Sequence, residues 1–408
     1  MIVSSDFRCD KTMRPDRRLQ LVPCPYQHAP RRFGGNLRLS PTSNMFDITM
    51  TRRLLSCGKS VLLHPAISAR PANAAPIPMA MNSSPASVKR GCYIGIDIGG
   101  ASIKAGVIDS EGKIRAQRNR AIAHESLPSL SRQIAAIVAE LKEADNKFEV
   151  RGVGIGVPAL VSKKKSRISI SPSLPYLNGV EFKSQMEGLL GLPVSLENDA
   201  NVAAYGEMSM GAARDVQDFV YVSIGTRVGA GLVINRRVYQ GAGGFAGELG
   251  HIAVDPEGKK CFCGGTGCLE RYVSAPSIAQ RVEERIVLNP SSALQIITDR
   301  PINAQDVSAA ALVGDKMACV IIGEVGRYLG MAIANLINLL NVQMVVLGGG
   351  VIEAGEVLLK PTIEEVKRHA LSPPYDDCLI VASALGSAAG VIGSSLLARD
   401  MLSVEAVL

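Results

Sequence analysis

The stretch YIGIDIGGASIKAGVID (Tyr93–Asp109) decides which fold the sequence predicts for most of this chain. Two short apolar runs within it are joined by the glycine pair Gly99 and Gly100, a pattern typical of a β-hairpin. A second stretch, FVYVSIGTRVGAGLVIN at Phe219–Asn235, repeats this order around another glycine-rich turn. The recurrence predicts a chain that is built from two architecturally similar halves.

Helices and strands are expected to alternate after each hairpin. After the first hairpin we predict a strand at Lys113–Arg120, a helix at Leu130–Ala144, strands at Arg151–Val157 and Val194–Leu196, and a helix at Asp199–Gly211. After the second we predict a strand at Arg237–Gln240, a long helix at Val307–Leu340, a strand at Gln343–Leu347, a helix at Ile352–His369, a strand at Cys378–Val381 and a helix at Ser387–Ala398. This alternation is typical of α/β folds with largely parallel sheets, here in two lobes with a cleft between them.

The length and composition of the chain agree with two packed cores. The sequence has 408 residues, of which 47% are hydrophobic, and this is too long for one ordinary domain. We predict a leader at residues 1–90 and an N-terminal lobe at 91–206 that the C-terminal helix 386–408 completes. A C-terminal lobe at 207–385 would contain a loop insertion at 241–274.

Residues 1–90 differ in composition from the rest of the chain. They contain eleven Arg and three Lys against four Asp and no Glu, a net charge of +10, together with ten Pro. An Arg-rich, acid-poor segment without helical or strand periodicity is typical of an organellar transit peptide. We predict a disordered leader, with a plastid or mitochondrial location if it is a transit peptide and a cytoplasmic one otherwise. A plain disordered tail and mistakenly translated upstream sequence are the alternatives.

Residues 91–408 carry 30 basic and 33 acidic side chains, so this part of the chain is slightly acidic. We therefore expect no nucleic acid among its partners. The longest apolar run, Gly330–Leu347, contains three Asn and one Gln, and it predicts a buried helix followed by a strand. No membrane association is expected.

The loop insertion contains the most specific motif of the sequence. Its spacing is H-x9-C-x-C-x4-C, formed by His251, Cys261, Cys263 and Cys268. One imidazole and three thiolates predict a tetrahedral Zn²⁺ site, and four protein ligands leave no open position, so this zinc would be structural. The alternative is a chance cluster of reduced cysteines.

Two glycine turns suggest a nucleotide site. The turn after Asp97 and the turn that begins at Gly225 occupy equivalent places in the two halves, and backbone amides at such turns can bind a polyanion. Asp97, at a strand end, could hold Mg²⁺. Gly348 and Gly349 lie between a strand and a helix, where a purine or phosphate can pack on the backbone. Ordinary hairpin turns are the alternative.

The motif Glu197-Asn198-Asp199 lies at the end of a predicted strand and at the start of a helix. Asn198 suits the helix N-cap. Asp199 occupies the place where reacting groups lie in open α/β sheets, and its carboxylate could accept the proton of an attacking sugar hydroxyl. Glu248, His251 and Glu270 near the zinc loop are suitable partners for sugar hydroxyls, or they only support the loop.

On these motifs, residues 91–400 resemble the ROK family, named for repressors, open reading frames and kinases. The resemblance implies the duplicated actin-like ATPase (ribonuclease H-like) fold and a glucokinase-like transferase in carbohydrate metabolism that uses Mg²⁺ and ATP. The implied reaction is phosphorylation of a hexose, at the 6-OH of glucose or of an N-acetylhexosamine. A homodimer is also expected, because members of the family often form dimers.

The resemblance also implies roles for individual residues. Asp199 would be the general base, and His251 would serve both zinc and sugar. The implied sugar-binding residues are Asn198, Glu248, His251, Glu270 and Ser173. The implied ATP-binding residues are Asp97, Gly99, Gly100, Lys104, Gly225, Thr226, Gly229, Gly348 and Gly349.

Several positions depart from the family pattern. Ala101 stands where the family usually has Thr, Arg227 replaces a glycine of the second turn, and Ser173 replaces an Asn in the sugar loop. Arg227 could pair with phosphate in place of the missing backbone approach. These departures keep a second hypothesis open, a sugar-binding regulator with weak or no kinase activity. A third, a hydrolytic actin-like ATPase, fits the predicted sugar residues less well.

Overall fold

The structure is a computed structural model that describes residues 90–109, 111–122, 126–144, 148–163 and 167–405. The predicted leader and transit peptide, at residues 1–89, lie outside the described residues. The described chain forms two five-stranded sheets and a separate two-stranded hairpin.

The first sheet is built from strands of both directions. Its strands are β1 (Arg90–Ile98), β2 (Ser102–Asp109), β3 (Ile114–Ala121), β4 (Phe148–Val157) and β7 (Val194–Asn198). They lie in the order β3-β2-β1-β4-β7, in which the first three strands are antiparallel and β1, β4 and β7 are parallel. The hairpin of β5 (Leu160–Ser162) and β6 (Arg167–Ile170) lies beside it and was not predicted.

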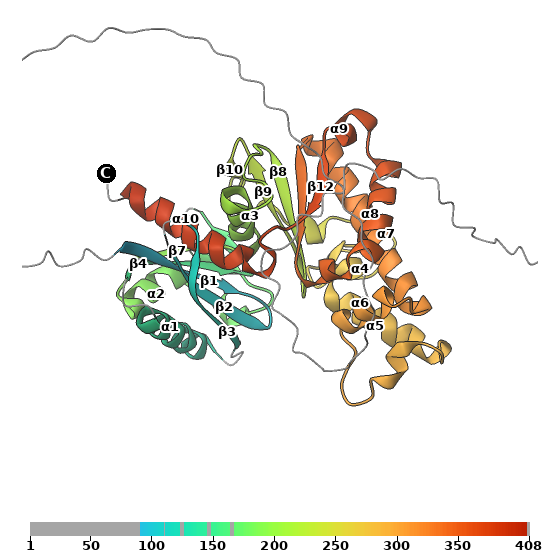
Figure 1. Ribbon diagram of the computed structural model, residues 1–408, viewed down its shortest axis with the longest axis horizontal. Helices are drawn as coiled ribbons and strands as arrows, with labels where there is room; N and C mark the ends of the chain where they lie inside the picture. The colour runs from blue at the N-terminus through green and yellow to red at the C-terminus, as the bar shows by residue number, and fades with distance from the viewer. Residues whose placement is uncertain (1–89, 110, 123–125, 145–147, 164–166, 406–408) are drawn as a thin grey trace, which may run out of the picture. The chain divides into compact units, whose positions relative to one another are not determined.

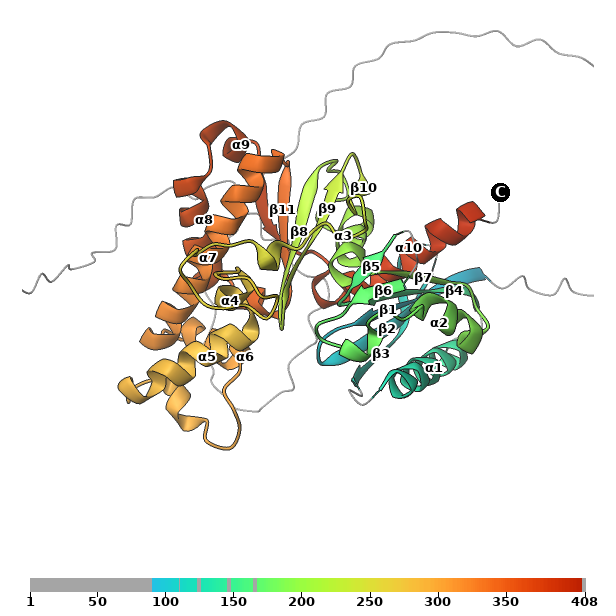
Figure 2. The ribbon, with the colours of Figure 1, turned by 180° about the vertical axis from the view of Figure 1, so that it is seen from behind.

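The second sheet has the same topology as the first. Its strands are β8 (Phe219–Ile224), β9 (Val228–Ile234), β10 (Arg237–Val238), β11 (Met344–Gly348) and β12 (Leu379–Ala382). They lie in the order β10-β9-β8-β11-β12, again with an antiparallel meander followed by two parallel strands. Both sheets are visible in Figures 1 and 2. The predicted architectural duplication is therefore confirmed.

Helices cover the first sheet on both faces (Figure 1). One face is covered by α1 (Leu127–Ala144) and α2 (Phe182–Leu190), and the other by α3 (Asp199–Met210) and α10 (Ala389–Glu405). The buried residues of α1 recur at helical spacing and give it an apolar stripe toward the sheet.

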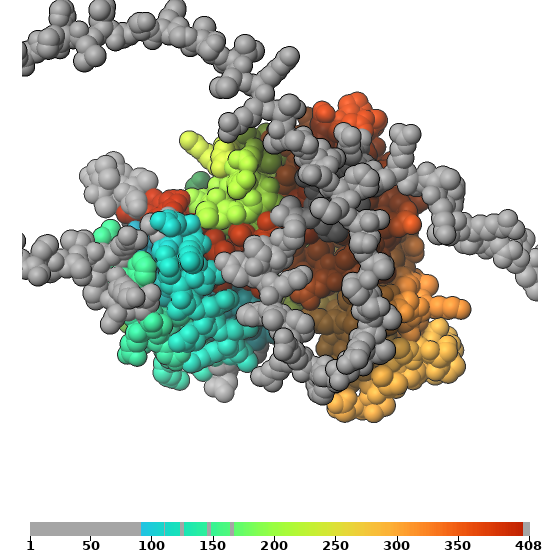
Figure 3. Space-filling model, in the orientation of Figure 1, coloured from blue at the N-terminus to red at the C-terminus, as the bar shows by residue number. Residues whose placement is uncertain are grey.

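The C-terminal helix packs directly on the backbone of the first sheet. Gly95 of β1 and Gly154 of β4 lie opposite each other, and a Cβ on either would come within 1.9 Å of a carbonyl oxygen of α10. Gly95 of the opening motif and Gly154 of β4 therefore let a helix from the far end of the sequence approach closely. The space-filling view shows these C-terminal residues, in red, against the first strands, in blue (Figure 3).

The second sheet is covered by a larger set of helices. They are α4 (Glu270–Val273), α5 (Ala275–Arg285), α6 (Ala304–Leu312), α7 (Lys316–Leu340), α8 (Glu356–His369) and α9 (Ser372–Asp376). Short 3₁₀ turns lie at Pro175–Leu177, Leu249–His251, Ile286–Leu288, Ala293–Ile296, Gly350–Ala354 and Gly386–Ala388.

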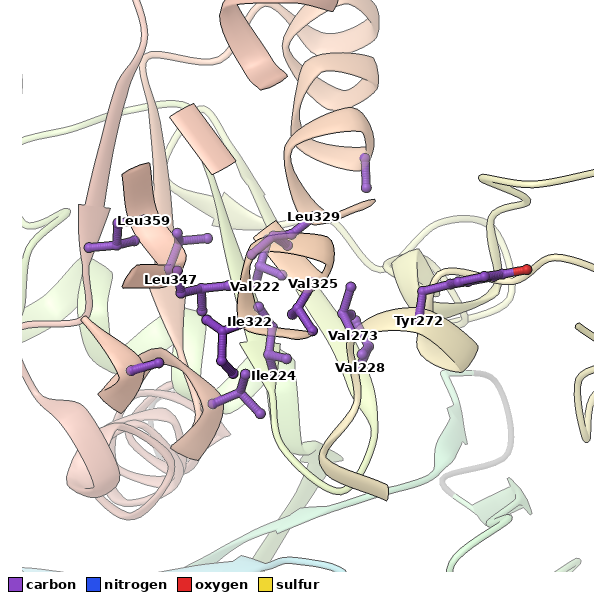
Figure 4. Packing of buried hydrophobic residues seen from close by; sticks show 14 of the residues in the cluster. Val222, Ile224, Val228, Tyr272, Val273, Ile322, Val325, Leu329, Leu347 and Leu359 are labelled. Carbon is purple, nitrogen blue, oxygen red and sulfur yellow. The ribbon is translucent and has the colours of Figure 1, made fainter. Parts of the chain in front are cut away.

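The core of this half is aliphatic. Residues of α7 such as Ile322 and Val325 pack on Val222 and Ile224 of the sheet (Figure 4). By length and composition α7 could cross a membrane, but 61% of its apolar window is buried inside the protein. It is therefore the central core helix of this lobe, as predicted for Gly330–Leu347.

Two details differ from the predicted elements. The long helix expected at Val307–Leu340 is two helices, because Gly314 has a φ of +88° and Asp315 caps α7 through a bond to the amide of Ala318. The proposed lobe boundary at residue 206 falls inside α3, which packs on α10 and also on β8 and β9.

Candidate functional site

Two carboxylates lie at one edge of the first sheet. Asp97 is near the end of β1 and is paired in register with Gly156 of β4. The next parallel strand, β7, ends at Asn198, and Asp199 is the first residue of α3. Because β1, β4 and β7 run in the same direction, these acidic groups lie at the same edge of the sheet.

Asp199 has the electrostatics of a base that works near neutral pH. Desolvation of its carboxyl group, followed by the negative charges of Asp97 and Glu248, raises its pKa to about 7. The amide of Ala200 donates to its Oδ1 at 2.9 Å and partly opposes the shift. A carboxylate with this pKa can accept a proton at physiological pH and release it again.

Asp97 lies beside Lys104, which is predicted to bind ATP. Desolvation raises the pKa of Asp97 to about 6, and Lys104, its register partner on β2, lowers it. Two carboxyl groups whose pKa values are both raised offer a place where a divalent cation would be stabilised.

The two glycine turns face each other. Gly99 and Gly100 connect β1 to β2, and Gly225, Thr226 and Arg227 connect β8 to β9. A Cβ on Gly100 would lie 3.4 Å from Cγ2 of Thr226. The amide of Gly99 donates to Ser102, and that of Gly225 to Arg227, so each turn is closed by its own backbone. In the second turn, Gly229 packs on Ala200 of α3.

Arg227 points toward the predicted sugar residues. Its Nε donates to Oγ of Ser173 at 2.8 Å, and its Nη1 lies 3.3 Å from Oε1 of Glu270. The other carboxylate oxygen of Glu270 accepts from the amide of Val228 at 3.1 Å. The guanidinium therefore links two residues for which sugar binding is predicted, whereas the pairing of Arg227 with phosphate stays a prediction.

The zinc-loop residues converge as their spacing predicted. The ligand atoms of His251, Cys261, Cys263 and Cys268 all lie within 4.8 Å of one another. Sγ of Cys261 is 3.7 Å from Nδ1 of His251, and Sγ of Cys263 is 3.6 Å from Sγ of Cys268. Ligands of a tetrahedral zinc with Zn–S bonds of about 2.3 Å are separated by roughly 3.7 Å, so the donor set fits this ion.

The ring of His251 is oriented between the thiolates and an acidic neighbour. Its Nδ1 faces Cys261, while its Nε2 lies 4.0 Å from Oε2 of Glu248. Desolvation raises the pKa of Glu248, Glu270 adds to the shift, and His251 opposes it. A histidine with one nitrogen on a metal presents the other as a fixed hydrogen-bond donor.

Gly348 is the last residue of β11 and Gly349 follows it, at a place where packing alone already requires glycine. A Cβ on Gly348 would lie 2.1 Å from Oη of Tyr221. Gly349 has a φ of +89°, and a Cβ there would lie 2.3 Å from the carbonyl oxygen of Ile224. The adenosine role of this pair stays a prediction.

The start of α3 is ordered by Asn198, which was predicted as its N-cap, and by Glu197, for which the sequence predicted no role. Oδ1 of Asn198 accepts from the amides of Ala200 and Asn201, so Asn198 is the N-cap, while its Nδ2 donates to the carbonyl of Ala159. Oε1 of Glu197 accepts from the amide of Asn198 and from Nδ2 of Asn201. The low exposure of Glu197, at 8%, was the structural signal that sequence alone lacked.

Two sheets of identical strand order, each with a glycine turn after its first strand, define the duplicated actin-like ATPase fold. The ROK family profile matches residues 93–401, and the chain belongs to this family. The match begins after the leader, so it gives no support to the predicted transit peptide.

Three known proteins show the range of the similarity. A glucokinase of Halalkalibacterium halodurans is 34% identical over 321 residues, covering 76% of this chain and 95% of the relative. A ROK family glucokinase from Streptomyces griseus, solved in complex with glucose and AMPPNP, has a TM-score of 0.70 and 34% identity, covering 76% of this chain and all of that one. The xylose repressor of Bacillus subtilis is 30% identical, covering 76% of this chain and 78% of the repressor.

Proposed function

We propose that this protein is an ATP-dependent hexose kinase that transfers the γ-phosphoryl group of ATP to a sugar hydroxyl, the 6-OH of glucose or of an N-acetylhexosamine. The sugar oxygen attacks the γ-phosphorus, the bond to the β,γ-bridging oxygen breaks, and ADP leaves. Asp199 accepts the hydroxyl proton. Transfer to this carboxylate keeps charge from building up on the attacking oxygen.

The single observation that carries this proposal is the environment of Asp199. Desolvation of its carboxyl group, together with the negative charges of Asp97 and Glu248, raises its pKa to about 7. A purely structural carboxylate is usually paired with a cation or saturated by donors, and its pKa is then lowered. The raised pKa of Asp199 therefore supports its assignment as the general base.

On the sugar side, we assign the hydroxyl contacts to Asn198, Glu248, His251, Glu270 and Ser173. Zinc held by His251 and the three thiolates would fix the loop that carries Glu248, and it would leave Nε2 of His251 free to donate to the sugar. Since four protein ligands close the coordination sphere, this zinc would order the loop without activating water.

On the nucleotide side, the two facing turns would hold the phosphates, with Lys104 and Asp97 at one end and Gly348 and Gly349 at the adenosine. Asp97 would hold Mg²⁺, which supplies charge neutralisation for the ATP phosphates when it is bound. The carboxyl of Asp97, with its raised pKa, fits such an ion.

A sugar-binding regulator is the second candidate, and one observation favours it. Arg227 bonds to both Ser173 and Glu270, so its side chain competes with a sugar for two of the proposed contacts. The similarity to a xylose repressor is consistent with a role of this kind.

For either candidate function, the proposal includes a homodimer and a cytoplasmic location.

An assay of ADP release across several sugars tests the choice between the two candidates. The panel consists of glucose, mannose, fructose, N-acetylmannosamine and N-acetylglucosamine, each with Mg-ATP and zinc-loaded full-length protein. Turnover with one sugar that is lost in Asp199→Ala, and retained in the exposed control Asp215→Ala, supports the kinase. Sugar binding by calorimetry without any turnover supports the regulator.

A further inference from the structure

We propose that the C-terminal lobe contains a second ligand site, a pocket of about 490 Å³ that binds a small phosphate monoester. The pocket is bounded by the zinc loop, α4, α5, α7 and α8, and no proposed ATP-binding or sugar-binding residue lines it. Four basic side chains do line it, and they are Lys259, Arg281, Arg285 and Arg327.

Arg281 is the buried side chain that would bind the ligand most directly. Its side chain is only 4% exposed, yet Nη1 has no hydrogen-bond partner among the described residues. The nearest carboxylate oxygen, Oε2 of Glu324, is 3.8 Å away, which is an ion-pair distance but too long for a hydrogen bond. A buried guanidinium with an unused N–H is unfavourable, so an acceptor oxygen placed in the pocket would be bound strongly.

The acidic side chains of the pocket are all paired with basic groups, two of them with basic side chains of the pocket itself. Glu324 accepts two hydrogen bonds of 2.9 Å from Arg285, in the bidentate arrangement. Glu365 is bound by Arg368 and His369, both outside the pocket.

The remaining acidic group, Glu284, is held by Lys259 at 3.6 Å and by Gln280 at 2.9 Å. Arg327 is exposed and makes no ion pair within the described part of the chain. Arg281 has only the 3.8 Å contact with Glu324, whose carboxylate Arg285 already occupies, so these two guanidinium groups can bind a dianion. A phosphate group supplies both the charge and several acceptor oxygens.

Two tyrosine rings provide an apolar wall for the rest of the ligand. The rings of Tyr272 and Tyr328 are 4.2 Å apart between centroids, and the Arg281 guanidinium carbon lies 6.0 Å and 5.8 Å from them. Met331 extends this surface. The wall suits the carbon skeleton of a phosphate ester better than free inorganic phosphate, which has no apolar part.

The pocket is connected to the proposed sugar site through α4. In Figure 4 Val273 points toward Val228, whereas Tyr272 on the same helix points to the opposite side. Oη of Tyr272 bonds to Asp255 and to the amide of Lys259, so this ring anchors the zinc loop. Glu270, at the start of the same helix, forms the ion pair with Arg227. A ligand on Tyr272 would therefore bias the sugar contacts, a consequence that rests on the proposed function.

Binding to full-length, zinc-loaded protein without ATP tests the site independently of catalysis. The probes are glycerol 3-phosphate, glucose 6-phosphate and inorganic phosphate, with glucose as the neutral control, each measured by calorimetry and by the shift in Tm. Wild type is expected to bind the esters and to gain Tm. Arg281→Gln and the exposed Arg327→Gln are each expected to weaken binding about tenfold, because each loses a charge-assisted contact. Arg214→Gln, which is 70% exposed and outside the pocket, should bind as wild type does.

The probes also distinguish the possible sources of the ligand. Tighter binding of glucose 6-phosphate than of glycerol 3-phosphate would identify a hexose phosphate, the product class of the proposed reaction, as the ligand. Equal binding would assign a general phosphate-ester site. The proposal is overturned if neither ester binds, or if both Arg281→Gln and Arg327→Gln retain wild-type affinity, since the ester would then occupy another place.

Discussion

The two sheets share one topology, yet the chemistry at their strand ends differs. In the first sheet, β1 ends near Asp97 and β7 leads into Asp199, so two carboxylates meet at one edge. In the second sheet, β11 ends at Gly348 and is followed by Gly349, and β12 is followed by Ser383. The duplication supplies the same scaffold twice, but the residues at the equivalent edges differ. The first sheet has two carboxylates there, and the second has two glycines and a serine.

The two glycine turns also differ in their side chains. The first turn has the glycine pair Gly99 and Gly100, whereas the turn of the second sheet has Arg227. That side chain leaves its turn to contact Ser173 and Glu270. Equivalent backbone positions therefore do not guarantee equivalent contacts, and each difference between the halves can be tested by substitution.

The largest effect is expected from removing the carboxylate of the first sheet. In Asp199→Ala, kcat should fall roughly 10²–10⁴-fold, because the attacking hydroxyl loses its proton acceptor. Steady-state kinetics measure this, with calorimetry showing that the sugar still binds. A variant that turns over sugar near the wild-type rate would mean that another group is the base.

The zinc loop, an insertion found only in the second half, should be the next most sensitive element. Cys268→Ser removes one ligand and should lower Tm by roughly 5–10 °C, since each kcal/mol lost corresponds to about 2–4 °C in a protein of this size. Thermal unfolding with and without a chelator measures the effect. Cys319→Ser, outside the cluster, serves as the control. A chelated protein of unchanged Tm and activity would contradict a structural zinc.

A smaller effect is expected from replacing Arg227 of the second turn by glycine. Arg227→Gly should lower KM for the sugar about fivefold, because a partly exposed ion pair contributes up to about 1 kcal/mol and its loss frees Ser173 and Glu270. KM for ATP should not change. Kinetics of this variant beside Arg214→Gly provide the measurement. A raised KM for ATP with an unaltered KM for the sugar would show that Arg227 serves phosphate.

The smallest effect concerns the coupling between the two carboxylates. Free-enzyme activity, measured as kcat/KM, should fall as pH drops below about 7, because protonated Asp199 cannot accept a proton. The negative charge of Asp97 raises the pKa of Asp199, so Asp97→Asn should move this acidic limb to lower pH by less than about one unit. Carboxyl ¹³C NMR titration of zinc-loaded protein without Mg²⁺ checks the shift directly. A limb that stays in place would remove Asp97 from the coupling.

The sequence predicted the repeated hairpins, the alternating elements and the converging zinc ligands well, because periodicity and motif spacing are local signals. It did not predict the break at Gly314, since one glycine inside an apolar helical pattern is easily tolerated. The contacts of Arg227 could not be predicted from the sequence either. Its two partners are 54 and 43 positions away in the sequence, and only the fold brings them together. The burial of Arg281 is likewise a tertiary property.

The most direct test of the central claim is a crystal structure of the zinc-loaded protein with glucose and a non-hydrolysable ATP analogue. An Asp199 carboxylate that acts as the base should lie about 2.6–3.2 Å from the sugar hydroxyl that faces the γ-phosphate. His251 and Glu248 should contact the same sugar from the zinc loop. A sugar hydroxyl that is bound by a different base, with the Asp199 carboxylate turned away from it, would contradict the proposed mechanism.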